Sequence, residues 1–188
     1  MIQLVKKAQK GDQEAFIQLI ERNKQAMYKV AIGILNNDTD AADALQDTIL
    51  SCYENLRTLR QPKYFKTWMT RILINHCTRI LKEHQKLIPI DSYVSKSSNC
   101  NSKELSCQES TSWTDNQDFF ELLNQMEETY RLVLLLYYVQ EFNIKEISQL
   151  LDMNENTVKS RLSRGRGLFR KIYLKKYPTY QYETKEVM

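Results

Sequence analysis

Positively charged side chains gather near the end of the chain in an arrangement that suits phosphate binding. From Asn154 to Lys176, eight lysines and arginines stand against one acidic residue, Glu155, so this segment has a net charge of +7. The whole chain of 188 residues has a net charge of only +4. Such local concentration of positive charge is the electrostatic footprint of nucleic-acid binding. A solvated basic helix would have the same composition, so charge alone leaves both interpretations open.

The periodicity of this segment favours DNA reading. On a helix of 3.6 residues per turn, one face collects apolar or small residues, namely Val158, Leu162, Gly165, Phe169 and Ile172. The opposite face collects hydrogen-bond donors and small residues, namely Asn156, Lys159, Ser160, Ser163, Arg164 and Gly167. A face of this kind fits a major groove, where such side chains pair with base edges.

A second, apolar helix is predicted just before the basic one. Its inward positions are Ile144, Ile147, Leu150 and Leu151. Asp152 stands where the chain must leave this helix, and Asp tolerates the left-handed conformation better than most residues. Asn154 is a good N-cap for the basic helix that follows. Helix, short turn and capped basic helix form the layout of a helix-turn-helix.

Composition divides the chain into parts. Residues 1–87 have helical periodicity, residues 88–117 are rich in Ser, Asn and Thr, helical periodicity resumes over 118–178, and 179–188 form a tail. With 4 Gly and 3 Pro the chain is predicted to be all-α, with two small helical domains joined by a flexible linker. The longest apolar run, 132–139, is too short to span a membrane and predicts a buried helix. The polar N-terminus does not resemble a secretory signal, so we expect a cytoplasmic protein.

Charge is also segregated within the first domain. Residues 38–54 contain five acidic and no basic residues, whereas residues 63–86 contain six basic residues and one acidic residue. The acidic helix is interpreted as a docking face for a basic protein, with a plain solvated face as the alternative. Tyr64, Phe65 and Trp68 lie among the basic residues, and stacking surfaces beside positive charge suit single-stranded nucleic acid. The alternative for Phe65 and Trp68 is a place in the core.

Catalysis is not expected. The carboxylates lack an accompanying nucleophile or phosphate loop, and the four cysteines contain no CxxC pair: Cys52, Cys77, Cys100 and Cys107. Free thiols are therefore expected, with no metal site, no cofactor and no small-molecule substrate. His76 and Cys77 are adjacent on a helix and so point in different directions.

Four stretches together resemble the extracytoplasmic-function (group IV) sigma factors of bacterial RNA polymerase. They are "KGDQEAFIQLIERN", "DALQDTIL", "FKTWMTRILINH" and "NENTVKSRLSRGRG", in that family's order and approximate spacing. The resemblance implies sigma region 2 at 1–87 and sigma region 4 at 118–178. It also implies binding to core RNA polymerase, through the beta-prime clamp helices and the beta flap, and to promoter DNA. An anti-sigma factor, often membrane-anchored, and a stress or envelope response are implied as well.

The resemblance assigns roles to individual residues. Polymerase docking is implied for Asp43, Gln46 and Asp47. Capture of the opened minus-10 strand is implied for Leu59, Arg60, Gln61, Pro62, Lys63, Trp68, Arg71, Asn75 and Arg79. Reading of the minus-35 element is implied for Asn156, Thr157, Lys159, Ser160, Arg161, Ser163, Arg164 and Arg166. Gly165 and Gly167 are expected to soften the last turns of the reading helix, by about 1 kcal/mol each.

A rival class remains from the residues alone. A stand-alone helix-turn-helix regulator would also carry the basic helix, and its first domain would sense a ligand or dimerise. That class predicts tight binding of a palindromic duplex operator by the isolated protein. A sigma factor instead predicts promoter-specific RNA only when core polymerase is present.

Overall fold

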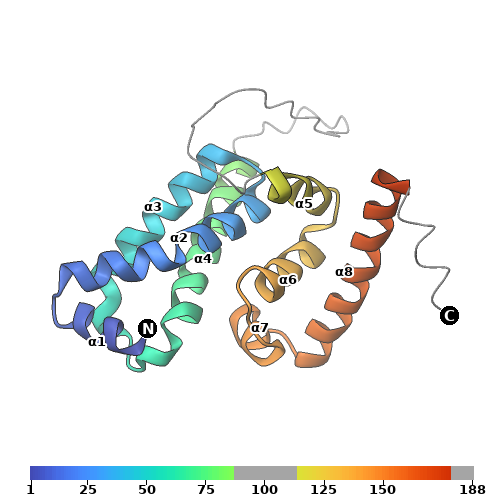
Figure 1. The fold of residues 1–188 in the computed structure, drawn as a ribbon. Coiled ribbons are helices and arrows are strands. Elements are labelled where there is room, and N and C mark those ends of the chain that lie inside the picture. Colours follow the sequence, from blue (N-terminus) through green and yellow to red (C-terminus); the bar gives the residue numbers. More distant parts are fainter. Residues whose placement is uncertain (87–113, 179–188) are drawn as a thin grey trace.

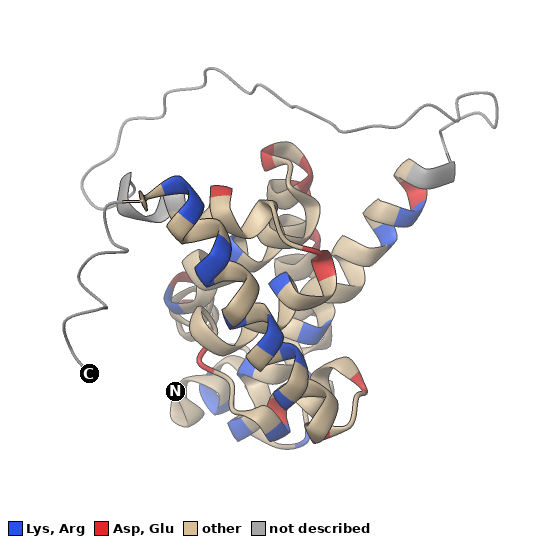
Figure 2. Cartoon of the chain, turned by 90° about the vertical axis from the view of Figure 1, so that its right-hand side faces the viewer, with Lys and Arg blue, Asp and Glu red and all other residues tan. Residues whose placement is uncertain are grey.

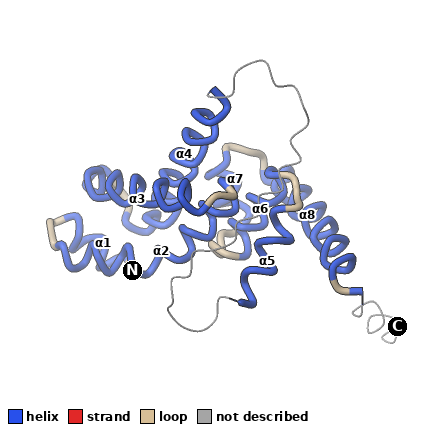
Figure 3. Tube along the Cα trace, turned by 90° about the horizontal axis from the view of Figure 1, so that it is seen from above, coloured by secondary structure: helices blue, strands red, loops and turns tan. Residues whose placement is uncertain are grey.

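A computed structural model describes residues 1–86 and 114–178. In these two ranges all regular elements are helices (Figure 1, Figure 3), which confirms the predicted all-α class. The predicted linker, 88–117, falls outside the described residues except for its last four positions, which begin helix α5 (Thr114–Asn124). The predicted tail, 179–188, lies outside the described residues, as do Cys100 and Cys107.

The first domain consists of four α-helices and two short 3-10 turns. These are α1 (Ile2–Gln9), α2 (Gln13–Leu35), α3 (Asp38–Asn55), η1 (Leu56–Thr58), η2 (Pro62–Tyr64) and α4 (Phe65–Lys86). Asp12 caps α2 by accepting a hydrogen bond from Ala15 N at 3.0 Å. Asn36 ends α2 in the left-handed conformation at φ 52°, and Asn37 caps α3. The polar "NND" stretch therefore turns the chain between two long helices.

The second domain consists of α5, α6 (Glu128–Tyr138), α7 (Ile144–Leu151) and α8 (Glu155–Lys176). The apolar run 132–139 falls largely in α6, and four consecutive residues from Val133 to Leu136 are buried. A helix buried on all sides needs apolar residues around its whole circumference, which explains the run. None of the described helices has the length and apolar character needed to cross a membrane.

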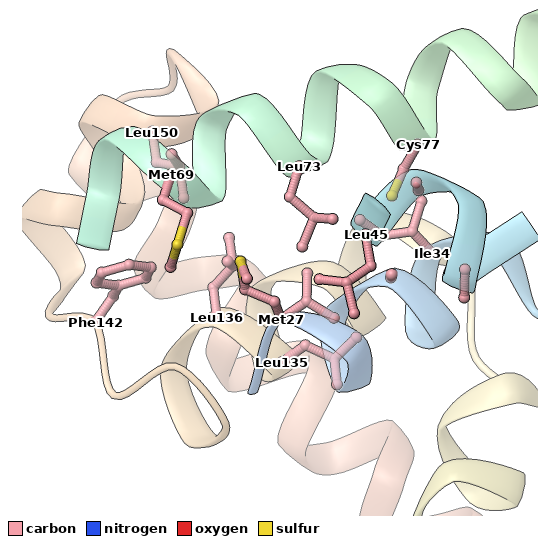
Figure 4. Packing of buried hydrophobic residues seen from close by; sticks show 14 of the residues in the cluster. Met27, Ile34, Leu45, Met69, Leu73, Cys77, Leu135, Leu136, Phe142 and Leu150 are labelled. Atoms are coloured by element: carbon pink, nitrogen blue, oxygen red, sulfur yellow. The ribbon is translucent and has the colours of Figure 1, made fainter. Parts of the chain in front are cut away.

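The two domains pack against each other and share one core. Helix α2 lies against α6, and α4 lies against α7. Figure 4 shows Met27 and Met69 of the first domain meeting Leu135, Leu136 and Phe142 of the second. The division into two helical domains was predicted, but this direct packing was not.

Candidate nucleic-acid interface

The helix-turn-helix is built by side chains that cap and turn the backbone. Asn143 and Glu146 form a capping box at the start of α7, with two reciprocal hydrogen bonds of 2.9 Å. Asp152 ends α7 in the left-handed conformation at φ 53° and ψ 47°, as predicted. The side chain of Asn154 accepts a hydrogen bond from Asn156 N at 2.8 Å, which confirms the predicted N-cap of α8. Local residue chemistry thus fixes the angle at which α8 leaves the turn.

The outer face of α8 presents most of the residues predicted to read the minus-35 element. The exposed ones are Asn156, Lys159, Ser160, Ser163, Arg164 and Arg166. Thr157 and Arg161 are half-buried and flank this face. Figure 2 looks onto the side of the molecule where α8 lies, and lysines and arginines recur along that helix. Arg170 and Lys171 are also exposed and extend the positive stripe by a further turn.

Arg166 differs from the other basic residues of α8. Its guanidinium carbon lies 5.3 Å from the ring centre of Tyr137 and 5.7 Å from that of Tyr138. Cation–π contacts of this kind hold an arginine on the flank of a helix. The structure therefore places Arg166 against α6, whereas Lys159 and Ser163 point to solvent.

Gly165 has a packing role that the sequence did not reveal. It is buried on the inner face of α8, and a Cβ there would lie 3.3 Å from Leu134 Cγ and 3.5 Å from Tyr130 Cβ. The glycine lets α8 approach α6 closely, so its low helix propensity is offset by packing. Gly167, with open space around it, carries only the propensity cost. Helix α8 is continuous through both residues.

In the first domain, the loop predicted to contact the opened strand is tied down by Gln9. The side-chain amide of Gln9 donates hydrogen bonds to Leu59 O at 2.7 Å and Leu56 O at 3.1 Å. Arg60, Gln61 and Lys63 of the loop are exposed, whereas Leu59 packs against the core. Sequence reasoning missed Gln9, because it lies 50 residues away from Leu59 in the chain.

Helix α4 presents the remaining residues predicted for the minus-10 strand. Phe65 is fully buried and belongs to the core, whereas Trp68 is half-buried and Tyr64 is exposed. The core alternative is therefore correct for Phe65. Asn75 is exposed but follows Phe65 by ten residues, about 15 Å along the helix axis. The structure brings Trp68 close to the loop and places Asn75 farther along the same helix.

The acidic face of α3 is partly neutralised inside the molecule. Asp43 and Gln46 are exposed, but Asp47 Oδ2 accepts a hydrogen bond from Arg79 at 2.6 Å. His76 lies 3.7 Å from the same carboxylate oxygen, and burial followed by the nearby Arg79 lowers the pKa of His76. An ion pair therefore joins a residue predicted for polymerase docking to one predicted for DNA.

Two apolar side chains on α3 extend this face, and the sequence interpretation did not include them. Leu50 is 57% exposed and Tyr53 is 55% exposed, one and two turns beyond Gln46. Protein-binding surfaces combine an apolar centre with a polar rim. Exposed large apolar residues following a helical acidic stripe are the signal that would have found them.

Neither the thiols nor the carboxylates form a reactive centre in the part of the chain that is described. Cys52 and Cys77 are buried free thiols, and burial raises the pKa of each to about 12. A thiol with so high a pKa is not a nucleophile at neutral pH. The described residues contain no cluster of three or more potential metal ligands. His76 contacts Ser51 Oγ at 3.0 Å rather than Cys77.

The fold and these surfaces define a two-domain helical protein with a helix-turn-helix for duplex DNA and a separate aromatic and basic face. Residues 19–87 match the family described as Sigma-70 region 2, and residues 116–168 match Sigma-70, region 4. These matches cover about two thirds of the chain. The chain therefore belongs to the sigma-70 family of RNA polymerase sigma factors, and its relatives place it in the extracytoplasmic-function group.

Similar proteins come from distant bacteria. The ECF RNA polymerase sigma factor SigW of Bacillus subtilis is 26% identical over 174 residues, which covers 89% of this chain and 93% of SigW. The ECF RNA polymerase sigma-E factor of Escherichia coli is 26% identical over 170 residues, covering 87% and 88% of the two chains.

Two solved structures have the same fold. CnrH, in complex with the cytosolic domain of CnrY, superposes with a TM-score of 0.66 at 20% identity, covering 92% of this chain and 96% of CnrH. The sigma factor RpoE of Bartonella quintana, in complex with the anti-sigma factor NepR, superposes with a TM-score of 0.64 at 21% identity, covering 84% and 96%.

Proposed function

We propose that this chain directs core RNA polymerase to promoters by dividing recognition between its two domains. The observation that carries the proposal is the coexistence, in one chain, of a positively charged helix α8 with an exposed polar face and an aromatic, basic face on α4. Duplex DNA is read by a helix in the major groove, and unpaired bases are held by stacking beside positive charge. One chain with both surfaces suits a protein that grips a promoter and then holds its opened strand.

Helix α8 would read the minus-35 element. Lys159 and Arg164 provide donors for guanine edges, and Asn156 has the amide geometry that pairs with adenine. Ser160 and Ser163 are small enough to let the helix approach the base pairs. Arg161 and Arg166, which lie on the flanks, fit phosphate contacts better than base contacts. Arg170 and Lys171 would add further phosphate contacts.

The loop from Leu59 to Lys63 and the exposed face of α4 would hold the minus-10 strand. The anchored loop offers an exposed backbone and the side chains of Arg60 and Gln61 for base edges. Trp68, Arg71, Asn75 and Arg79 continue along α4 at helical spacing, so they would contact successive nucleotides.

Helix α3 would dock onto the polymerase. Asp43, Gln46 and Asp47 give a polar, acidic patch, and Leu50 supplies the exposed apolar centre. The beta-prime clamp helices are the proposed partner of this patch, and the beta flap is the proposed partner of the second domain. Catalysis of RNA synthesis would belong entirely to the polymerase, so the chain itself would act without enzymatic activity.

An anti-sigma factor is the proposed regulator. CnrH and RpoE, which share this fold, occur in complex with the cytosolic domain of CnrY and with the anti-sigma factor NepR. We place this chain in the cytoplasm, held inactive by such a protein, which is expected to be anchored at the inner face of the membrane. Release in an envelope or stress response would then let the chain bind polymerase.

Run-off transcription tests the proposal. Core polymerase is mixed with this chain and a library of promoter fragments, and the RNA products are sequenced. Defined start sites that appear only with both components are expected. A second variant, Asp43→Ala, should reduce these products and also reduce co-purification with core polymerase. Tight binding of a palindromic duplex by the isolated chain, without any effect on transcription by core enzyme, would instead assign the protein to the stand-alone regulators.

A further inference from the structure

Helices α2 and α4 of the first domain lie directly against α6 and α7 of the second domain. Met27 and Met69 are fully buried, and Figure 4 shows them beside Leu135, Leu136 and Phe142. Gly33 on α2 lies so close to Leu135 that a Cβ at position 33 would be 2.1 Å from Leu135 Cδ1. The domains are therefore held together by a close apolar contact.

Two cations of α4 also reach across this contact. Lys66 Nζ donates to Gln140 O at 2.5 Å and lies 5.3 Å from the ring centre of Phe142. The guanidinium of Arg71 donates to the carbonyl of Gln149, on α7. Both donors belong to the basic helix proposed to hold the opened strand. A phosphate and these carbonyl oxygens cannot occupy the same donors at once.

The contact leaves the other DNA surface open. Asn156, Lys159, Ser160 and Ser163 on α8 remain exposed, and α8 lies at the edge of the molecule away from α2 and α4 (Figure 1). The closed arrangement therefore affects the two proposed DNA surfaces unequally.

We propose that this closed arrangement is self-inhibitory. In the free chain, the second domain masks part of the α4 face for single-stranded DNA, while the α8 face for duplex DNA stays available. A partner that separates the domains would unmask α4. This inference rests on the proposed function, because it concerns the same strand-binding face.

One buried residue keeps the closed arrangement easy to open. Gln140 is 1% exposed, and among the described residues neither polar atom of its side-chain amide has a hydrogen-bond partner. A buried amide without partners loses its hydrogen bonds to water without replacement. Opening would return this amide to water, so the closed state carries a built-in penalty.

Two substitutions should shift the equilibrium in opposite directions. Gly33→Ala places a methyl group against Leu135, which supplies all three of the nearest atoms, and overpacking of this kind should favour the open state by about tenfold. Alanine also forms helices better than glycine, so α2 itself is not weakened. Gln140→Met keeps the volume, removes the unpaired amide and should favour the closed state by about tenfold.

The experiment uses the full chain with three readouts. Small-angle X-ray scattering measures the radius of gyration. Fluorescence anisotropy measures affinity for a labelled oligothymidylate and, separately, for a labelled duplex. Because apparent affinity scales with the fraction of binding-competent molecules, Gly33→Ala should bind oligothymidylate more tightly than wild type, and Gln140→Met more weakly. Duplex affinity should stay constant. Gln18→Ala, an exposed change on α2, is the matched control.

The readouts separate the possible failures. An equal radius of gyration for Gly33→Ala, Gln140→Met and wild type overturns the closed-to-open equilibrium. An expanded Gly33→Ala chain with unchanged affinity for oligothymidylate overturns the masking of α4. If Gly33→Ala loses helix content by circular dichroism, Gln140→Met decides alone, through weaker binding or its absence. Run-off transcription, which tests the proposed function, is independent of all three readouts.

Discussion

Gln9 offers a direct test of how the first domain positions its strand-binding loop. The substitution Gln9→Ala removes the hydrogen bonds to Leu59 O at 2.7 Å and Leu56 O at 3.1 Å. A typical neutral hydrogen bond contributes about 0.5–1.5 kcal/mol net. Leu56 O still accepts from Leu59 N at 3.2 Å, so most of the loss falls on Leu59. We expect the free energy of unfolding to fall by about 1–2 kcal/mol.

Urea denaturation and hydrogen exchange measure this effect. The melting temperature should fall by about 2–4 °C for each kcal/mol, and amide exchange should accelerate in the loop from residue 59 to 63. If the anchored loop holds the opened strand, transcription from a duplex promoter should fall by up to about 30-fold, the equivalent of 2 kcal/mol.

The control for this test is Gln3→Ala, which removes the same side chain from an exposed position on the same helix. It should leave stability, exchange and transcription unchanged. Equal behaviour of Gln9→Ala and Gln3→Ala in all three assays would refute the claim that Gln9 anchors the loop.

Three further predictions concern α8, α7 and the α3–α4 contact. Arg164→Ala should weaken minus-35 use by about 1–3 kcal/mol and change the preferred sequence in a promoter selection; an unchanged profile would contradict the groove assignment. Asn143→Ala breaks the capping box of α7 and should cost about 1 kcal/mol in urea denaturation, whereas no loss would mean that the cap is dispensable. Burial and Arg79 lower the pKa of His76 in the folded chain, so the unfolded chain binds that proton more readily. Stability should therefore fall as pH drops below about 6.5, His76→Gln should reduce that fall, and parallel pH profiles would argue against it.

Local chemistry explains why much of the helix-turn-helix was predictable. Asp152 and Asn154 act on backbone groups only a few residues away, so their roles follow from residue type and position. The inner face of α8 also follows from spacing, since Val158 and Leu162 are buried as the 3.6-residue period requires. The exposed positions for base contacts follow as the complement of that face.

Contacts between distant segments were not predictable. Gln9 and Leu59 are 50 residues apart, and Arg79 and Asp47 are 32 residues apart. Nothing in either local sequence marks its partner, because a glutamine or an arginine on a half-exposed face has many possible acceptors. The same reasoning explains why Leu50 and Tyr53 were missed as exposed apolar residues.

The sequence by itself determined the helices, their caps, the charge of each face and the family. These features depend on periodicity and on residue types within a few positions of each other. Only the tertiary structure decided that Gly33 meets Leu135 and that Lys66 meets Gln140, across more than 70 residues of chain. Complementary shape and donor geometry select those partners, and neither exists until the helices are packed.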